Sequence, residues 1–247
     1  MTDETRLPWL TIVRGETPLI VSMPHTGIDI PPDIESGLVS PWLARKDADW
    51  WVNCLYDFAH SLGATVIRTA ISRTVIDCNR DPSVASSIPV VSETTEVPGN
   101  RDLTASDRAA RVAEIFAPYH ARIAALLDAR QAAGRRTVFV AMHSFTPVFK
   151  GESRAMQVGV LYNRDARMAR IMLALLRAES DLVVGDNAPY AVSDTSDYGV
   201  PVHAERRGLA HVEIEIRQDL IAEEAGQIAW AARLARLLRT ADERLRG

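Results

Sequence analysis

The sequence is poor in cysteine and contains no long apolar run. Its two cysteines, Cys54 and Cys78, form no CxxC pair, so neither a disulfide framework nor a thiolate metal site is expected. Two reduced, buried thiols fit a reducing compartment. No apolar run approaches the roughly 20 residues that a membrane-spanning helix needs. The acidic start MTDETRLPWL also lacks the apolar segment of a secretory signal. We therefore expect a cytoplasmic protein that does not enter a membrane.

Clustered positive charge is also missing. The net charge is −4, and the 28 lysine and arginine residues are dispersed along the chain. A nucleic-acid-binding protein would carry a basic patch, so we expect a small molecule rather than a nucleic acid as the partner. The sequence carries no indication of an oligomeric state.

Short apolar runs alternate with segments of helical periodicity along all 247 residues, without a repeat or a linker. We therefore expect one domain, residues 1–247. Predicted strands cover residues 19–23, 64–71, 74–78, 137–142, 158–162, 182–184 and 211–216, and predicted helices cover 41–62, 109–133, 167–178 and 225–238. The helix at 109–133 should kink or divide at Pro118. Strands that alternate with helices predict an α/β layer fold with a largely parallel sheet.

Two long polar segments, residues 83–104 and 185–210, interrupt this alternation. The first is rich in Ser, Pro, Thr and Gly and has no clear period. Long loops inside compact domains often close over a functional site, so both segments are candidate lids.

Two of the six histidines directly follow predicted strands. His25 stands in Met-Pro-His-Thr-Gly and His143 in Ala-Met-His-Ser-Phe. Ligands gather beyond the carboxyl ends of the strands in such sheets, so the two imidazoles could meet at one edge. Imidazole is the commonest zinc ligand, and a catalytic zinc keeps three protein ligands and one open position. The alternative is that both are ordinary polar residues in loops.

A nearby carboxylate could supply the third ligand. Asp47 and Asp49 stand in Lys-Asp-Ala-Asp-Trp-Trp. Two positions apart on a helix, they point to different sides, so only one should face a metal. The neighbouring apolar residues do not decide which one, and solvated charge on a helix surface is the alternative for both.

Glu215 belongs to a predicted strand that carries its charges on one face. In His-Val-Glu-Ile-Glu-Ile-Arg, residues 211–217, apolar and charged residues alternate. An edge strand with a solvated face would explain this pattern. In a central strand, covered on both faces, such charges are costly unless they line a site. There Glu215 could take a proton from water and pass it to a leaving amine.

Arg73, Asn79 and Arg80 stand close together in Ser-Arg-Thr-Val-Ile-Asp-Cys-Asn-Arg. A guanidinium group can hold a carboxylate through two parallel hydrogen bonds. The segment could therefore bind a substrate with one or two free carboxylates. A salt bridge of Arg80 with Asp77 or Asp81 is the structural alternative.

Together these segments resemble the N-formylglutamate amidohydrolase (N-formylglutamate deformylase) family, which is related to zinc carboxypeptidases and aspartoacylase-like deacylases. The likeness runs in order over most of the chain and is most specific at residues 72–80. Its other parts are residues 22–27 (SMPHTG), 47–50 (DADW), 55–59 (LYDFA), 62–64 (LGA), 143–144 (HS) and 215–220 (EIRQDL). The resemblance implies a three-layer α/β/α fold of the zinc-dependent exopeptidase type, with a mixed, largely parallel central sheet.

The resemblance also implies one zinc ion held by two histidines and one acid. His25 and His143 match the histidines, and Asp49 is the preferred acid, with Asp47 as the runner-up. Glu215 falls where the family carries its catalytic glutamate.

The implied substrate is a small N-acyl amino acid such as N-formylglutamate, whose acyl amide, with formyl preferred, would be hydrolysed. Asn79-Arg80 looks like the substrate-binding pair of the aspartoacylase-like relatives, and Arg73 looks like their polarising arginine. Further contacts could come from three residues of the second polar segment, Tyr190, His203 and Arg206. The chain lacks the longer middle region of the histidine-degrading deformylases, which leaves the acyl group and the amino acid open.

Two alternatives belong to other mechanisms or classes. A metal-free serine hydrolase would use Ser72 or Ser144, but no Gly-x-Ser-x-Gly elbow surrounds either serine. A carboxylate-binding module on the same scaffold would have lost catalysis. Retention of both histidines, a nearby acid and Glu215 argues against that module.

Overall fold

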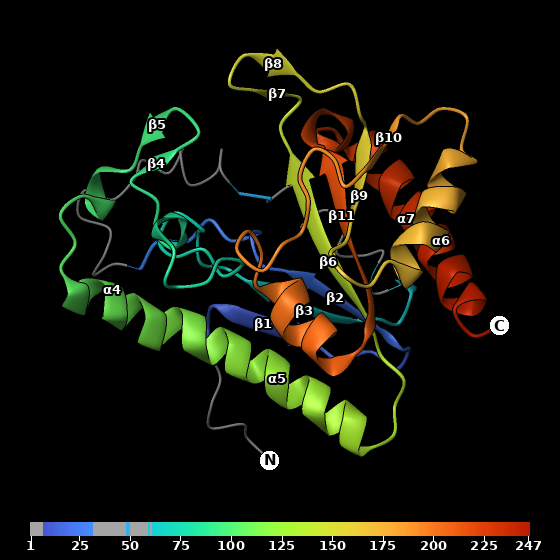
Figure 1. The fold of residues 1–247 in the computed structure, drawn as a ribbon, viewed down its shortest axis with the longest axis horizontal. Coiled ribbons are helices and arrows are strands. Elements are labelled where there is room, and N and C mark those ends of the chain that lie inside the picture. Colours follow the sequence, from blue (N-terminus) through green and yellow to red (C-terminus); the bar gives the residue numbers. More distant parts are fainter. Residues whose placement is uncertain (1–6, 32–47, 50–58, 60) are drawn as a thin grey trace.

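The computed structural model describes residues 7–31, 48, 49, 59 and 61–247 (Figure 1). The predicted helix over 41–62 therefore lies largely outside the described residues, as do Cys54, His60 and Asp47. Within the described part of the chain, no helix is long and apolar enough to cross a membrane.

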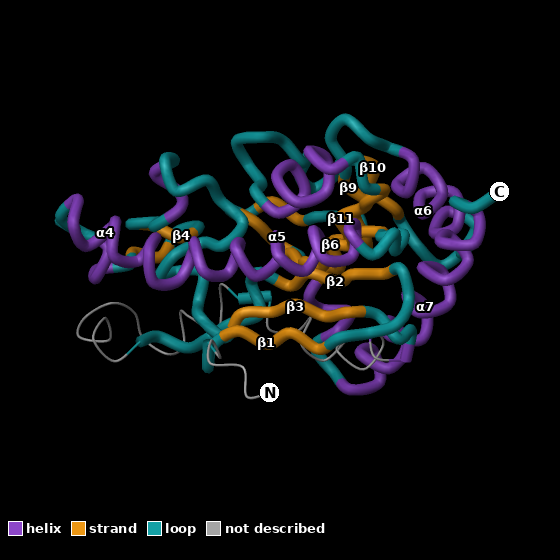
Figure 2. Tube along the Cα trace, turned by 90° about the horizontal axis from the view of Figure 1, so that it is seen from below, coloured by secondary structure: helices purple, strands orange, loops and turns teal. Residues whose placement is uncertain are grey.

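A seven-stranded mixed sheet forms the middle layer. Figure 2 shows its strands stacked from one edge to the other. Their order is β1 (Leu10–Val13), β3 (Thr65–Thr69), β2 (Leu19–Met23), β6 (Val138–Phe145), β11 (Ala210–Arg217), β9 (Val158–Leu161) and β10 (Val184–Asp186). Two neighbouring pairs, β1–β3 and β11–β9, are antiparallel, and the other four are parallel. The predicted mixed, largely parallel sheet is confirmed.

Helices cover both faces of the sheet, which gives the predicted three layers (Figure 1). On one face, α6 (Arg167–Arg177) and α7 (Glu224–Arg244) pack on alternate residues of the central strands, such as Val140 and Ile214. On the other face, α5 (Ala117–Ala132) packs on the residues between them, such as Phe139 and Ala141. Because β6 and β11 are covered on both faces, an ionised side chain on either strand is buried.

The predicted division at Pro118 is confirmed. A capping box between Thr104 and Asp107 starts α4 (Ala105–Arg111), and a π-helical turn, η3 (Val112–Phe116), separates α4 from α5. Pro118 stands in the first turn of α5. Because proline has no N–H, the regular α-helical ladder cannot run through this position unchanged.

The predicted strand over 74–78 is wrong. The segment forms turns, in which the Val75 N–H donates to the Ser72 carbonyl. Arg111 and Asn100 donate to carbonyl groups of the same segment, where a neighbouring strand would otherwise do so. The β-branched residues that predicted a strand are buried in the core beneath α5. Their composition therefore reflects burial rather than sheet pairing.

The two polar segments contain short regular structure. The first holds η1 (Ala85–Ser87), β4 (Val91–Ser92), β5 (Thr95–Glu96) and η2 (Pro98–Asn100). The second holds η4 (Gly199–Ala204) and η5 (Glu205–Arg207). A further hairpin joins β7 (Val148–Phe149) to β8 (Glu152–Ser153), and η6 (Gln218–Ile221) follows β11.

Candidate metal centre and its cavity

His25, Asp49 and His143 converge at the carboxyl edge of the parallel strands β2 and β6. Their ligand atoms lie within 4.8 Å of one another, and all three residues are buried. The Asp49 Oδ2 atom lies 3.0 Å from Nδ1 of His143 and 3.4 Å from Nδ1 of His25. His25 follows β2 as expected, but His143 lies within β6 rather than after it, because that strand continues to Phe145.

Ser144 fixes the orientation of the Asp49 carboxylate. Its N–H and its hydroxyl donate to Asp49 Oδ1 at 3.1 and 2.8 Å. The other oxygen is thereby directed at the two imidazoles. Burial alone would raise the pKa of Asp49, but hydrogen bonds from His143 and His25 outweigh it and hold the pKa below its ordinary value.

Asp77 holds the other side of the His25 ring. Its Oδ1 lies 2.6 Å from His25 Nε2, and its Oδ2 accepts a 2.6 Å hydrogen bond from Arg73. Burial would raise the pKa of Asp77, but the charges of Arg73 and His25 keep it well below the ordinary value. Asp77 therefore holds the Nε2 side of the His25 ring, and Nδ1 faces Asp49. Sequence reasoning considered Asp77 only as a salt-bridge partner of Arg80.

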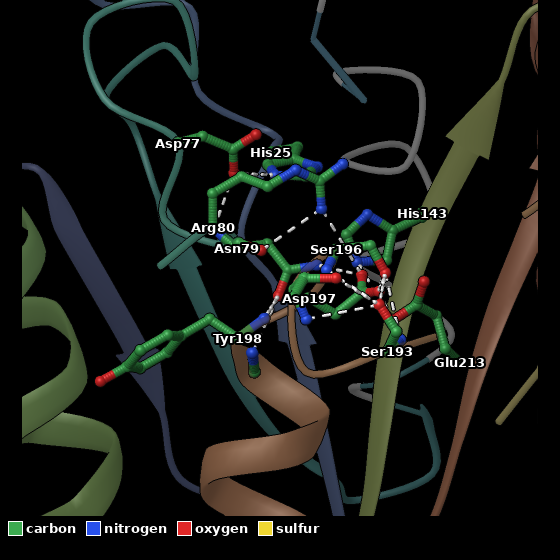
Figure 3. Close-up of polar contacts among 12 residues, drawn as sticks. His25, Asp77, Asn79, Arg80, His143, Ser193, Ser196, Asp197, Tyr198 and Glu213 are labelled. Atoms are coloured by element: carbon green, nitrogen blue, oxygen red, sulfur yellow. Dashed lines mark hydrogen bonds and ion pairs between the residues drawn. The ribbon is translucent and has the colours of Figure 1, made fainter. Parts of the chain in front are cut away.

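Glu213 and Glu215 approach His143 from β11. The Glu213 Oε2 atom lies 3.9 Å from His143 Nε2, at ion-pair distance, and Glu215 stands opposite His143 in the strand register. Figure 3 shows Asp77 beside His25 and Glu213 beside His143. Because β11 lies between β6 and β9, the alternative of an edge strand with a solvated face is wrong.

The buried charges are out of balance. Burial raises the pKa of Glu213 to about 8 and that of Glu215 well above its ordinary value. Burial would lower the pKa of His143, yet the surrounding carboxylates, Glu213 foremost, raise it to about 10. Oxygen atoms of both glutamates and Nε2 of His143 also lack a hydrogen-bond partner. Two imidazole nitrogens and one carboxylate are a donor set that suits a divalent cation such as zinc. The other buried carboxyl groups around them also favour a positive ion.

A cavity of about 320 Å³ opens over this cluster. Four further residues predicted from the sequence line it, namely Arg73, Asn79, Arg80 and Tyr190. The structure does not bring His203 and Arg206 into it. His203 is buried against His120, and Arg206 lines a separate surface pocket beside Asp81.

Asn79 links the cavity wall to the second polar segment. Its amide nitrogen donates to Asp197 Oδ1 at 3.0 Å, and its amide oxygen accepts the N–H groups of Tyr198 and Gly199. The guanidinium group of Arg80 lies 3.8 Å from Asp197 Oδ1 (Figure 3). Among the described residues, Arg80 thus pairs with Asp197, which is 117 positions away in the chain, and the sequence offered no signal for this contact.

The two candidate nucleophilic serines have other partners. The Ser144 hydroxyl donates to Asp49, and the Ser72 hydroxyl shares a 2.8 Å hydrogen bond with Thr74. A serine nucleophile needs a base within hydrogen-bond distance. Within the described residues, no hydrogen bond joins either hydroxyl to an imidazole, so nothing in this geometry supports the serine hydrolase.

Comparison with known proteins identifies relatives along the whole chain. The model of the N-formylglutamate amidohydrolase family matches residues 17–222. An N-formylglutamate deformylase of Pseudomonas aeruginosa is 30% identical over 251 residues, which cover 93% of this chain and 91% of the relative. The crystal structure of gene product Atu2144 from Agrobacterium tumefaciens superposes with a TM-score of 0.87 at 33% identity, covering 97% of this chain and 96% of that one. An N-formylglutamate amidohydrolase of Ralstonia eutropha JMP134, with a TM-score of 0.72 at 22% identity over 98% of this chain and all of that one, shares the fold.

Replacement of Asp49 should remove metal binding, whereas replacement of Asp47 should not. A zinc titration against a chromophoric chelator should give an affinity at least roughly 100-fold weaker for Asp49→Ala, since loss of even an outer partner of a metal ligand costs 10- to 100-fold. The Asp47→Ala variant is the matched control and should bind metal like the unmodified protein. The reverse pattern would make Asp47 the ligand.

The buried His120–His203 pair should make the protein less stable in acid. His120 Nε2 donates to the Cys78 carbonyl, so its Nδ1 accepts the 2.8 Å hydrogen bond from His203 Nε2, and both rings are neutral. Burial lowers their pKa values to about 3 and about 4, against 6.5 for a free imidazole. The unfolded chain therefore takes up protons that the folded protein does not. Each histidine should lower the free energy of unfolding by roughly 2 kcal/mol between pH 8 and 5.

Urea unfolding at several pH values measures this dependence. The amide of His120→Gln can still donate to the Cys78 carbonyl and accept from His203. That variant should lose about half of the acid sensitivity assigned to the pair, because one titrating group remains. Identical pH profiles for the variant and the unmodified protein would refute the assignment.

Proposed function

The chain belongs to the N-formylglutamate amidohydrolase family and is a hydrolase of amide bonds, and from this premise we propose that it removes the acyl group, formyl first among them, from a small N-acyl amino acid such as N-formylglutamate. The observation that carries the proposal is the buried His25–Asp49–His143 cluster, which shares a cavity with Glu215. The match over residues 17–222 supports a single catalytic unit, to which we assign a cytoplasmic location.

We assign zinc as the metal, held by Nδ1 of His25, Nδ1 of His143 and the Asp49 carboxylate. Zinc bound to these donors would polarise the acyl carbonyl and activate water for attack. Asp77 and Glu213 support this assignment, because each lies on the Nε2 side of one ring and leaves Nδ1 toward Asp49. Carboxylates in this position orient metal-binding histidines in many proteins.

Glu215 moves the proton. It takes one proton from the attacking water as the bond between oxygen and the acyl carbon forms. It then gives that proton to the amide nitrogen as the carbon–nitrogen bond breaks, so that formate and an amino acid leave. Its burial supports this role, because burial raises the pKa of Glu215 and a carboxylate with a raised pKa is a stronger base.

Two arginines are assigned to different negatively charged groups of the substrate. Arg73, which is fixed by Asp77 and lies 3.4 Å from His25, is placed to stabilise negative charge on the acyl oxygen. Arg80 is placed to bind the amino acid's carboxylate. The contact of Asn79 with substrate stays a prediction. Since Asp197, Tyr198 and Gly199 engage its amide, we assign it to holding the wall beside Arg80.

The Glu215→Gln variant should keep the fold and the metal but lose the proton acceptor. We expect kcat for N-formylglutamate to fall by roughly 100- to 10,000-fold, the usual contribution of a general base. The matched control is Glu213→Gln on the same strand, which should lose less than about tenfold because Glu213 lies 3.9 Å from His143 Nε2 and is assigned no proton transfer. Full turnover by metal-loaded Glu215→Gln would eliminate Glu215 as the base.

The Arg80→Met variant should mainly weaken substrate binding. Loss of one charge-assisted contact to a carboxylate should raise KM roughly 10- to 100-fold and change kcat little. Steady-state kinetics on N-formylglutamate at saturating zinc separates the two parameters. A fall in kcat with an unchanged KM would instead assign Arg80 to the transition state.

A further inference from the structure

The outer part of the cavity has an aromatic wall, formed by Phe145, Phe149 and Tyr190. Phe145 ends β6, two positions after His143, and Phe149 belongs to the β7–β8 hairpin. Tyr190 follows β10 and is 42% exposed at the mouth. A ligand held at the His25–Asp49–His143 cluster would therefore extend toward these rings.

Arg154 fixes the wall from behind. Its guanidinium carbon lies 5.6, 4.6 and 4.9 Å from the ring centres of Phe145, Phe149 and Tyr190. It also donates to the Tyr190 hydroxyl at 2.8 Å and to the Thr146 carbonyl at 3.4 Å. One cation that contacts three rings from separate segments holds them together. The wall is thus a preformed aromatic surface, held by a cation that lies outside the cavity lining.

The charges in the cavity match one substrate carboxylate better than two. Within the described part of the lining, the cationic side chains are Arg73 and Arg80. Arg73 is bound to Asp77 at 2.6 Å, whereas Arg80 lies 3.8 Å from Asp197 and is the more available cation for a single carboxylate. The side chain of a glutamate substrate would carry a second carboxylate toward the aromatic wall and Glu93, which also lines the cavity. Arg154 is engaged by the three rings and the Tyr190 hydroxyl and lies outside the cavity lining, so a carboxylate at the wall has no cationic partner within the described lining.

We propose that the aromatic wall is the subsite for the substrate's side chain, and that the enzyme prefers N-formyl amino acids with one carboxylate and an apolar or aromatic side chain over N-formylglutamate. This inference rests on the proposed function and specifies its substrate class. Arg80 binds the α-carboxylate, the formyl group lies at the metal cluster, and the side chain packs on Phe149 and Tyr190.

Five substrates separate charge from apolar contact. The zinc-loaded full-length enzyme is assayed for formate release from the N-formyl derivatives of phenylalanine, leucine, glutamine, glutamate and glycine. Glutamine and glutamate have nearly the same size and differ in charge, so kcat/KM should be higher for glutamine. Phenylalanine and leucine should exceed glycine by roughly 10- to 100-fold, the range that apolar pockets provide.

A pair of adjacent variants tests the wall itself. Phe149→Ala should reduce the ratio of kcat/KM for N-formylphenylalanine over N-formylglycine by at least about 10-fold. Val148→Ala is the control, because its exposed side chain alternates with Phe149 along β7 and lies outside the cavity lining. That variant should leave the ratio unchanged.

The outcomes distinguish the two proposals. A higher kcat/KM for N-formylglutamate than for the glutamine and phenylalanine derivatives would overturn the subsite and leave the proposed function intact. An unchanged ratio in Phe149→Ala would also overturn the subsite. Hydrolysis of none of the five compounds by metal-loaded enzyme would refute the proposed function, and the subsite assignment with it.

Discussion

The excess of buried negative charge at the carboxyl ends of β6 and β11 is the constraint on which the rest of the site depends. Asp49, Glu213 and Glu215 all face His143 where solvent is excluded, and an unpaired charge in such a place costs several kcal/mol. Ser144 and the other imidazole compensate only part of it. Burial raises the pKa of Glu213, and the surrounding carboxylates, Glu213 foremost, raise the pKa of His143. A divalent cation bound there would supply the missing charge, so cation binding and stability of the folded state should be coupled.

Backbone pairing, rather than loop structure, sets the position of Glu215 relative to His143. Glu215 stands opposite His143 in the β11–β6 register, and opposite Gly159 on the other side. A Cβ atom at Gly159 would lie 2.3 Å from the Ala188 carbonyl oxygen and 3.3 Å from the Cβ of Glu215, so only glycine fits. The proposed general base, Glu215, is thereby held on a rigid strand, which suits a proton transfer that tolerates little misplacement.

Sequence reasoning predicted what local pattern encodes. The alternation of strands and helices gave the layers, and the strand ends placed His25 and His143 at one edge. The charged face of residues 211–217 indicated a functional site, because β11 is a central strand on which charges are costly unless they line such a site. Contacts between residues distant in the chain could not be predicted, because the sequence around Arg80 does not indicate Asp197 and the sequence around His203 does not indicate His120. The strand predicted over residues 74–78 was wrong because burial without a neighbouring strand favours the same β-branched residues as a strand does.

The last three residues of β6 serve three different purposes. The groups proposed for the reaction are thereby distinct from those proposed for substrate specificity. His143 belongs to the His25–Asp49–His143 cluster, Ser144 orients Asp49, and Phe145 begins the aromatic wall. The first two lie among buried groups whose replacement would leave a charge unpaired, so the reaction type is strongly constrained. The rest of the wall lies on a hairpin and a loop, which can change without disturbing the sheet. Family membership is therefore a better guide to the type of reaction in this cavity than to the side chain of the substrate that binds there.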